Sequence, residues 1–491
     1  MNESEQKICR QEKPPDRITA LALIYLGLPF FIFFQGWFEW PWGILLTLVT
    51  ASGLFLALSK NDYSLANSGP IWLRGYVAIV TVGVTWTLFG GAGHFFYANY
   101  DWFFRDAVLR DLTMAHWPPG YGVTDEGPVI LRAPIAYFLP SAAIGKLMGV
   151  EFADKALWLW TACGTVLFLL LLPLPARLSP RLILGLVIVM FFSGLDLLGM
   201  LLINLEPIEA GQHLEWWGWL FQYSSNTTQL FWVPNHALPA WIAIAMFYRH
   251  WRHPSFAYYV PITGALLPLW SPFAAIGMAP FYLLWFFNQF KQVKWHPMIW
   301  IPALMILLAT VPYLALSVHA IPASLTMDSG GVGLDLFVSL YLSFVIFEFI
   351  LIWLLVYRPE DKILWVSTGI ILLVLPFLHF GPGNDIVMRG SIPALMMLCI
   401  FTILAIAQFR EMPVRRIVLL VGLLLVGAVT PMQEFIRAVK NQPWSPHLDR
   451  NLYQTAKNNL PPHYTAVLKP SGLGLVMREP DDLLNKRDSG D

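Results

Sequence analysis

Long apolar runs alternate with short polar segments along almost the whole chain. A membrane-crossing helix needs roughly 20 mostly apolar residues, and about 13 segments reach or approach that length. They cover residues 17–37, 41–59, 72–92, 155–175, 182–204, 236–249, 256–270, 272–289, 298–317, 335–357, 363–380, 391–409 and 414–431. Helices satisfy their own backbone hydrogen bonds in lipid. The pattern therefore predicts an all-α polytopic membrane protein.

One further apolar segment, 133–149, is shorter and contains two prolines and Lys146. We interpret it as an interfacial or re-entrant helix, because a full crossing would invert every later loop. Lys and Arg concentrate on cytoplasmic loops. With a cytoplasmic N-terminus, six successive loops place these residues inside: Lys60 and Arg74, Arg177 and Arg181, Arg249 and Arg252, Lys291 and Lys294, Arg358 and Lys362, and Arg410, Arg415 and Arg416. The C-terminus is then extracytoplasmic.

This topology divides the chain into three parts. Residues 1–16 form a cytosolic tail, 17–431 a transmembrane domain, and 432–491 an extracytoplasmic C-terminal extension. The outer loops are 93–132, 205–235, 318–334 and 379–390. The extension is interpreted either as a small cap with a strand or two or as a loosely ordered tail.

The charge content supports a lipid environment and limits the function. Charged residues make up 13% of the chain, against roughly 25% in a typical soluble domain. The 31 basic residues balance 31 acidic ones, so nucleic acid is not an expected partner. The sequence also lacks a Walker loop and the HExxH, GxSxG and CxxC motifs, which leaves ATP-driven and covalent nucleophilic chemistry without visible machinery.

The first outer loop holds a concentrated set of charges among aromatic residues, NYDWFFRDAVLRDL. On a helix, Asp101 and Arg105 share a face, as do Asp106 and Arg110. One interpretation is a solvated amphipathic helix whose ion pairs contribute little. The other is a functional site, which the surrounding aromatic residues favour.

The second outer loop and the residues that follow it, 204–239, combine His213, Glu215 and His236 with several tryptophans. Carboxylates bind sugar hydroxyls and aromatic rings stack on a sugar's apolar face, so a sugar site is one interpretation. An interfacial tryptophan anchor with incidental acids is the alternative.

The fourth outer loop, HFGPGNDIVMRGSIP, places Asn384, Asp385 and Arg389 at the mouth of a span. Arg389 could bind a lipid-linked phosphate through two parallel hydrogen bonds. Alternatively, Asp385 and Arg389 pair with each other at a helix start. Asp196 and Glu348 lie within apolar spans, where ionisable groups are functional candidates or bond one helix to another.

These features together resemble the GT-C superfamily of membrane glycosyltransferases. The resemblance rests on the many spans, the acidic aromatic outer loop and the stretches YDWFFRDAVLRDL, FFSGLDLLG, YSSNTTQLFWVPNHALP, PLWSPFAAIG and GPGNDIVMRGSIPAL, which are similar to a bacterial branch of this kind over most of residues 95–395. It implies a bacterial inner (plasma) membrane location. In this family the first large outer loop usually follows the first span, whereas here it follows the third.

The resemblance implies a sugar donor linked to polyprenyl phosphate and a lipid, glycan or protein acceptor. Asp101 matches the family's general base, with Asp106 as the fallback, and Arg389 matches the group that neutralises the departing phosphate. Arg105, His213, Glu215, His236, Asn384 and Asp385 are expected to bind substrate. Some members need a divalent metal such as Mg²⁺ or Mn²⁺ and others do not, so the metal requirement stays open.

Two other classes of function fit the same topology. An envelope polysaccharide polymerase or ligase would be expected to use arginines in its outer loops, whereas acids are at least as prominent here. A lipid or solute transporter or flippase would need polar groups along a path through the bilayer. Asp196, Glu348 and Lys146 are too few to trace such a path.

Overall fold

The computed structural model describes residues 16–60, 73–205, 207–381, 383–446, 449–457 and 459–484. The predicted cytosolic tail therefore lies outside the described residues except for Asp16. Within the described residues, eight helical segments are long and apolar enough to cross a membrane: Arg17–Trp37, Trp40–Ser59, Val150–Leu171, Pro180–Asn204, Pro297–Ala315, Leu334–Leu355, Asp385–Ala407 and Val414–Lys440. The chain is thus a mostly helical, multi-pass membrane protein, as predicted.

Four of these segments are continuous helices, and four are built from consecutive pieces. The continuous ones are α2 (Arg17–Trp37), α3 (Trp40–Ser59), α7 (Val150–Leu171) and α14 (Pro297–Ala315). The composite ones are α8 (Pro180–Phe191) with α9 (Asp196–Gly199) and η1 (Met200–Asn204), α16 (Leu334–Val345) with η5 (Ile346–Ile350) and α17 (Leu351–Leu355), α19 (Asp385–Gly390) with α20 (Ile392–Ala407), and α21 (Val414–Gly427) with α22 (Val429–Lys440).

Five further helices correspond to the other predicted spans but are shorter. They are α4 (Leu73–Leu88), α11 (Pro234–His250), α12 (Phe256–Trp270), α13 (Pro272–Asn288) and α18 (Lys362–Val374). At a rise of about 1.5 Å per residue, these helices extend only part of the way across a hydrocarbon core of roughly 30 Å. The predicted number of about 13 spans therefore stays a prediction.

The burial of each helix shows its place in the bundle. Nearly all residues of α11 are buried, and 89% of the most apolar stretch of α19–α20 is buried. By contrast, that share is 22% for α21–α22 and 28% for α16–α17, so these helices expose apolar side chains at the periphery. A helix that is apolar all round and buried belongs to the interior, whereas exposed apolar faces suit lipid.

The remaining short helices and the strands lie mostly in the predicted outer loops and in the C-terminal extension. The helices are α5 (Trp102–Met114), α6 (Leu139–Met148), α10 (Asn226–Trp232), α15 (Thr326–Gly330) and α23 (Leu452–Thr455). The strands are β1 (Gly120–Thr124), β2 (Gly127–Leu131), β3 (Ala323–Leu325), β4 (Leu378–Phe380) and β5 (Thr465–Val467). Strands β1, β2 and β5 form one antiparallel sheet and β3 pairs with β4.

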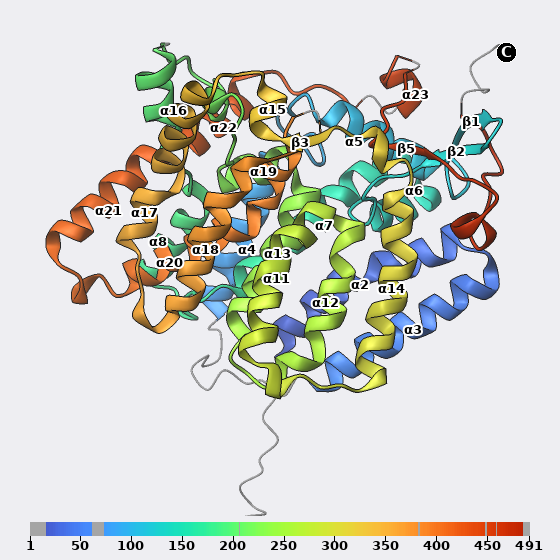
Figure 1. The fold of residues 1–491 in the computed structure, drawn as a ribbon, viewed down its shortest axis with the longest axis horizontal. Helices are drawn as coiled ribbons and strands as arrows, with labels where there is room; N and C mark the ends of the chain where they lie inside the picture. The colour runs from blue at the N-terminus through green and yellow to red at the C-terminus, as the bar shows by residue number, and fades with distance from the viewer. Residues whose placement is uncertain are drawn as a thin grey trace, which may run out of the picture.

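This pairing shows how the loops assemble. Ile130 of the first outer loop faces Ala466 of the C-terminal extension, and Ser324 faces His379 across two other outer loops. Figure 1 places α5, β5, β3, α15 and α22 along its upper edge. The described part of the extension therefore packs onto the first outer loop through β5.

Helix α6 occupies the segment interpreted as interfacial or re-entrant. Its ten residues span about 15 Å, which is half of a hydrocarbon core. Lys146 near its end donates a hydrogen bond of 2.5 Å to the carbonyl of Ala115, and its ammonium lies 4.9 Å from the Trp117 ring. These contacts hold the end of α6 against the first outer loop.

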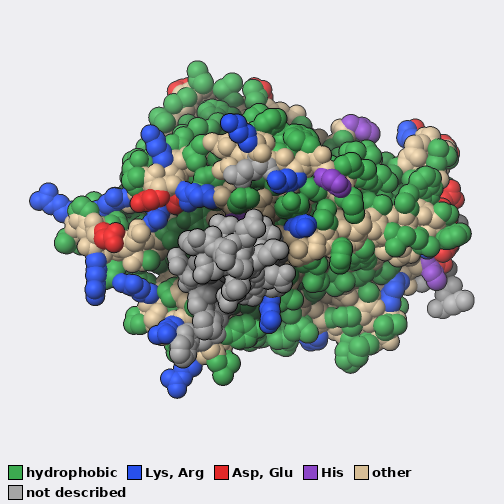
Figure 2. Space-filling view, turned by 90° about the horizontal axis from the view of Figure 1, so that it is seen from below, with side chains coloured by type: hydrophobic (Ala, Val, Ile, Leu, Met, Phe, Trp, Pro, Cys, Tyr) green, Lys and Arg blue, Asp and Glu red, His purple; other side chains and the backbone are tan. Residues whose placement is uncertain are grey.

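Several loops predicted to be cytoplasmic contact one another. Asp16, which caps the start of α2, lies 2.7 Å from Arg249 at the end of α11. Arg252 in the same predicted loop lies 2.9 Å from Asp361, which precedes α18. Figure 2 shows this lower face with basic side chains more prominent than acidic ones. The basic loops thus gather on one side of the bundle.

Candidate active-site cavity

A cavity of about 700 Å³ lies where the four predicted outer loops and the C-terminal extension meet. Its polar lining consists of Tyr100, Asp101, Arg105, Arg132, Asn235, His236, Asp385, Arg389, His463 and Tyr464. The fold thus brings together residues that are as many as 364 positions apart in the sequence, Tyr100 and Tyr464. Five of the nine predicted site residues are among them: Asp101, Arg105, His236, Asp385 and Arg389.

Asp101 directly precedes α5 and points toward Arg105. The two side chains form an ion pair of 3.3 Å, as their spacing predicts. Asn99 fixes the start of this helix: its Oδ1 accepts from the Asp101 backbone N–H at 3.1 Å, and its Nδ2 donates to the Phe231 carbonyl at 3.0 Å. The Asp101 side chain is about one-third exposed, so its carboxylate is accessible from the cavity.

The interpretation of this segment as a solvated amphipathic helix is wrong. Most residues of α5 are buried, including Arg105, which is 6% exposed. The Trp102 indole donates a hydrogen bond of 2.9 Å to the Phe231 carbonyl at the end of α10. Helix α5 is therefore part of the interior between the first and second outer loops.

Asp385 and Arg389 line the cavity from α19 and form an ion pair of 3.1 Å with each other. Both sequence interpretations of Arg389 thus retain support, because the pair forms and the guanidinium also reaches the cavity. The Arg389 guanidinium lies 5.9 Å from the Phe273 ring. Neighbouring Asn384 does not line the cavity: its Nδ2 donates to the Leu220 carbonyl at 3.1 Å.

His236 contributes from the start of α11. Its Nδ1 lies 2.6 Å from Ser271 Oγ, and that hydroxyl also accepts from the Ala274 backbone N–H and so caps α13. Asn235 beside it has a buried Oδ1 without a hydrogen-bond partner among the described residues. These polar groups lie at the junction of α11, α12 and α13.

The other walls of the cavity are apolar and extend to the outside of the bundle. Ile276 on α13 is 48% exposed, and Val311 on α14 is 46% exposed, yet both also line the cavity. Helices α13 and α14 lie on either side of α12 and are peripheral at these positions (Figure 1). The cavity therefore reaches a surface that a bilayer would cover with lipid.

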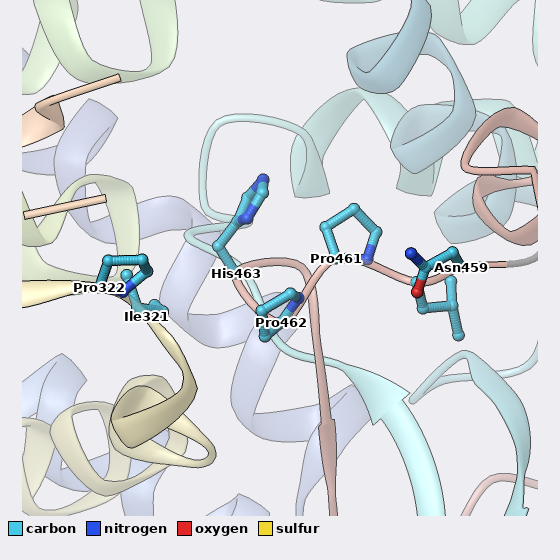
Figure 3. A pocket seen from close by; sticks show the side chains of 7 residues that line it. Ile321, Pro322, Asn459, Pro461, Pro462 and His463 are labelled. Carbon is cyan, nitrogen blue, oxygen red and sulfur yellow. The ribbon is translucent and has the colours of Figure 1, made fainter. Parts of the chain in front are cut away.

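A smaller pocket of about 290 Å³ adjoins this cavity and shares Ile321, Pro461 and His463 with it. Figure 3 shows Ile321 and Pro322 on one side of the pocket and Asn459 on the other, with His463 between them. Burial lowers the pKa of His463, and nearby Asp385 opposes that shift. The extension thus contributes one wall to both pockets.

Asp106, the fallback base, lies outside the cavity. Its carboxylate lies 3.1 Å from His94 Nε2, and His94 Nδ1 lies 3.0 Å from Asp154 on α7. Burial raises the pKa of Asp106. Burial alone would lower the pKa of His94, but the two carboxylates raise it to about 9. This charged cluster joins α5 to α7 and leaves Asp106 without access to a substrate in the cavity.

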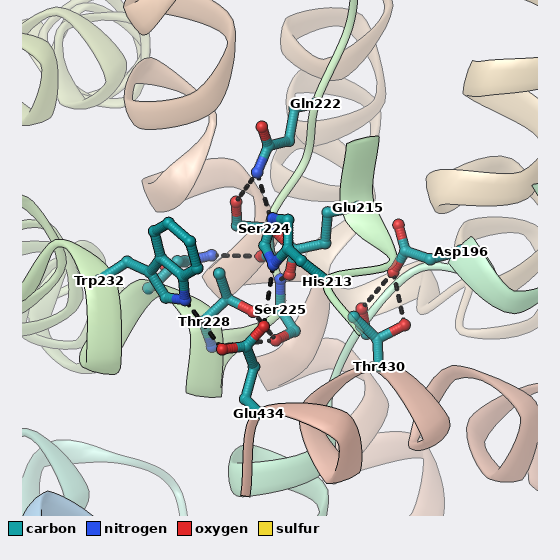
Figure 4. Close-up of polar contacts among 12 residues, drawn as sticks. Asp196, His213, Glu215, Gln222, Ser224, Ser225, Thr228, Trp232, Thr430 and Glu434 are labelled. Atoms are coloured by element: carbon teal, nitrogen blue, oxygen red, sulfur yellow. Dashed lines mark hydrogen bonds and ion pairs between the residues drawn. The ribbon is translucent and has the colours of Figure 1, made fainter. Parts of the chain in front are cut away.

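His213 and Glu215 belong to a second, closed polar cluster, shown in Figure 4. Glu215 accepts hydrogen bonds from the Gln222 side chain (3.0 Å) and the Ser225 backbone (2.9 Å). His213 Nδ1 lies 2.9 Å from Glu434 on α22. Burial raises the pKa of Glu215 to about 7. Burial alone would lower the pKa of His213, but its bond to Glu434 raises it.

The two acids predicted within spans lie at the inner end of the same cluster. The Trp217 indole N–H faces both, at 3.3 Å from Asp196 and 3.0 Å from Glu348. Thr430 donates a further hydrogen bond of 2.8 Å to Asp196. These contacts fit the helix-to-helix bonding interpretation of Glu348. The exposed Trp216 and Trp219 on either side suit an interfacial anchor.

Five polar residues of the cavity were not among the predicted site residues: Tyr100, Arg132, Asn235, His463 and Tyr464. Arg132 carried a signal, since it is a lone arginine in the apolar stretch PVILRAPIAYF. The extension residues carried none, because only the pairing of β2 with β5 brings them to the cavity.

The side chains that line the cavity are not arranged like the ligands of a metal ion. Within the described ranges, no three His, Cys, Asp or Glu side chains are placed to hold an ion together. The two carboxylates of the cavity are each paired with an arginine.

No protein-family model, curated protein or solved structure matches this chain. The chemistry of the cavity therefore rests on its own residues. Three guanidinium groups face two carboxylates, so the lining has one net positive charge with neutral histidines. Together with the apolar walls, this arrangement suits an amphiphilic anion.

Proposed function

We propose that the chain is a membrane glycosyltransferase that moves a sugar from a polyprenyl-phosphate carrier to an extracytoplasmic acceptor. The observation that carries this proposal is the lining of one cavity, where the accessible carboxylate of Asp101 lies among Arg105, Arg132 and Arg389 beside apolar walls. A carboxylate suits a general base, guanidinium groups suit a phosphate, and apolar walls suit a lipid chain.

In the proposed reaction, an acceptor hydroxyl attacks the anomeric carbon of the sugar. The Asp101 carboxylate takes the hydroxyl proton while the bond between the acceptor oxygen and the anomeric carbon forms. The bond between that carbon and the phosphate oxygen breaks, and its electron pair stays on the phosphate. The carrier leaves as polyprenyl phosphate with one additional negative charge, which the arginines stabilise.

The Asp101–Arg105 pair gives the base a defined orientation. Arg105 is nearly buried, and the ion pair of 3.3 Å draws the Asp101 carboxylate toward it along the cavity wall. A base held in this way needs no large movement when the acceptor binds, which is how enzymes reduce the entropic cost of reaction.

The proposal includes a membrane topology. In this topology the five shorter helices also cross the membrane: α4, α11, α12, α13 and α18. Together with the eight longer segments they make about 13 spans. The basic face seen in Figure 2 would be cytoplasmic and the cavity extracytoplasmic, in a bacterial inner membrane. The N-terminus would then be inside and the C-terminus outside.

The test is a transfer assay on purified protein in lipid nanodiscs, with radiolabelled polyprenyl-phosphate sugars as donors and crude envelope lipid, glycan and protein as acceptors. We expect Asp101→Asn to lower the transfer rate by about 10²- to 10⁴-fold, as is usual when a general base is lost. Asp125→Asn, in the exposed turn between β1 and β2, is the matched control and should keep wild-type activity.

Transfer at the wild-type rate by Asp101→Asn would contradict its role as the base. If the protein is folded but transfers sugar from none of the donors, the two other classes of function would be favoured, a transporter or flippase and a polysaccharide polymerase or ligase. Movement of a whole lipid-linked sugar between leaflets would indicate a flippase, and joining of preformed glycan chains would indicate a polymerase or ligase.

A further inference from the structure

Asp196 and Glu348 lie close together at irregular points of two predicted spans. The chain is not helical over residues 192–195, between α8 and α9, and Asp196 follows this break directly. Glu348 occupies the π-helical turn η5, a kind of turn that is frequent at functional sites. The Leu195 backbone N–H donates a hydrogen bond of 3.0 Å to the Phe347 carbonyl. The break in one span is therefore joined to the irregular turn in the other.

Asp196 has the hydrogen-bond partners of an ionised carboxylate. Its Oδ2 accepts from the hydroxyl groups of Ser193 at 3.0 Å and Thr430 at 2.8 Å, the second of which is drawn in Figure 4. Its Oδ1 accepts from the Trp217 indole N–H at 3.3 Å. An ionised carboxylate only accepts hydrogen bonds, and three donors converge on this fully buried side chain. This arrangement stabilises a negative charge on Asp196.

Glu348 is surrounded differently. Its Oε1 accepts from the same indole N–H of Trp217 at 3.0 Å, and that group has one hydrogen to share between two acids. Its Oε2 is buried and has no hydrogen-bond partner among the described residues. The backbone of Gly194 packs so closely on Oε2 that a side chain at position 194 would overlap with it. An ionised Glu348 would therefore leave one buried oxygen without any donor, which is costly.

No positive charge compensates the two acids directly. Within the described ranges, neither acid forms an ion pair with Lys, Arg or His. The cations of the cluster are His213 and Arg437, and these pair with Glu434 instead, at 2.9 Å and 3.0 Å. The acid beside the pair, Glu215, adds a further carboxyl group. Two adjacent carboxylates in such a buried site cannot both ionise without a large electrostatic cost.

We propose that Asp196 and Glu348 form a proton-binding site, in which one proton resides on Oε2 of Glu348 and is donated to Asp196. The two side chains are close enough to form this hydrogen bond, and the proton turns the unsatisfied oxygen into a donor. A proton fits where a larger ligand does not, because Oε2 has no space beside it for a water molecule or a metal ion. The pair then carries one negative charge. This site is separate from the cavity and does not depend on sugar transfer.

Infrared spectroscopy of the full chain detects such a proton directly, because the C=O stretch of a carboxylic acid is separate from the bands of a carboxylate. The protein is measured at pH 7 in a detergent that contains no ester or acid groups. We expect Glu348→Gln to remove one carboxylic-acid band from the wild-type spectrum. Glu434→Gln is the matched control. Glu434 is likewise 3% exposed, but it accepts hydrogen bonds from Trp232 and Arg437, so its loss should leave the carboxylic-acid bands unchanged.

Thermal unfolding in nanodiscs tests which acid carries the proton. Glu348→Gln keeps a donor, the amide N–H, in the place of the carboxylic-acid O–H, so its melting temperature should match that of the wild type. Asp196→Asn removes the charge on which three donors converge, so its melting temperature should fall by about 3 °C or more. Glu434→Gln should fall in the same way, because it removes the charge that pairs with His213 and Arg437.

The proposal requires both results for Glu348→Gln, the loss of the band and the wild-type melting temperature. An unchanged carboxylic-acid spectrum would overturn it, because Glu348 would then be ionised in the wild type. A melting temperature as low as that of Asp196→Asn, or a failure of Glu348→Gln to fold, would also overturn it. If Asp196→Asn were neutral and lost the band instead, the proton would reside on Asp196 and the assignment to Glu348 would be wrong.

Discussion

His94 Nε2 lies 3.1 Å from the Oδ2 atom of Asp106, and both side chains are buried. The other ring nitrogen of His94 faces Asp154, so both nitrogens meet carboxylate oxygens. Carboxylates beside both ring nitrogens favour the doubly protonated, cationic imidazole. Asp106 is next to Arg105 on α5, so this contact also determines which face of the helix meets the cavity.

We expect His94→Gln to lower the free energy of unfolding by up to about 3 kcal/mol, because the pKa of His94 is raised from 6.5 to about 9 in the folded protein. The charged groups around His94 are Asp106 and Arg105 on α5 and Asp154 and Lys155 on α7. A raised folded pKa gives stability that is complete below pH 6.5 and is lost as the pH rises through 9. The measurement is thermal unfolding in nanodiscs between pH 6 and 10.

His116→Gln provides the control for this pH dependence. His116 belongs to the same outer loop, but its side chain is 71% exposed, so its substitution should change stability by less than about 0.5 kcal/mol. If wild type and His94→Gln lost stability in parallel between pH 7 and 10, the imidazolium would not be the stabilising group.

The pair Asp385–Arg389 allows its structural role to be separated from its role in the cavity. Arg389→Gln leaves Asp385 partly buried without its partner, so the apparent melting temperature should fall and transfer should fall about tenfold or more. In the double variant Asp385→Asn/Arg389→Gln, no unpaired charge remains. We expect the melting temperature to recover while transfer stays low. Recovery of both would show that the pair only stabilises α19.

The apolar pattern predicted the helices well because each span needs a long apolar segment regardless of its neighbours. The pairing of Asp101 with Arg105 was also predictable, since it depends only on helical spacing. By contrast, Asp106 and Arg105 are adjacent in sequence but face different partners. Spacing alone could not determine which of the two faces the cavity, because that depends on His94 and α7.

Residues that depend on distant contacts were not predictable. Arg132 reaches the cavity because β2 pairs with β5, more than 300 residues later in the chain. His213 and Glu215 have the residue types of a sugar site, yet α22 covers them through Glu434. The predicted span 414–431 ended before Glu434, so nothing in the apolar pattern indicated that this residue would close the cluster.

The cavity mouth gives a prediction about the lipid chain. Ile276→Trp places a large side chain where the cavity meets the bilayer, so the KM for a long-chain polyprenyl-phosphate sugar should rise about tenfold. A water-soluble short-chain donor should be affected much less, because it does not need that exit. Leu283→Trp, two turns further along α13 and also exposed, should leave both KM values unchanged. Equal effects on both donors would place the lipid chain elsewhere.

The indole of Trp217 provides the last test, because its N–H faces Asp196 and Glu348 together. Trp217→Phe leaves both buried acids without this donor and also removes part of the side-chain volume. Trp285→Phe is matched for volume: Trp285 is buried, and its indole nitrogen has no hydrogen-bond partner in the described part of the chain. Trp217→Phe should therefore destabilise the protein by about 1–3 kcal/mol more than Trp285→Phe.

Thermal unfolding of the two variants in the same nanodiscs measures this difference. A larger loss in Trp217→Phe means that the indole N–H stabilises the two acids, which connect the start of α9 to the π-helical turn η5. Equal losses would mean that packing alone accounts for Trp217. Asp196 would then be stabilised by Ser193 and Thr430, which already donate to it at 3.0 Å and 2.8 Å.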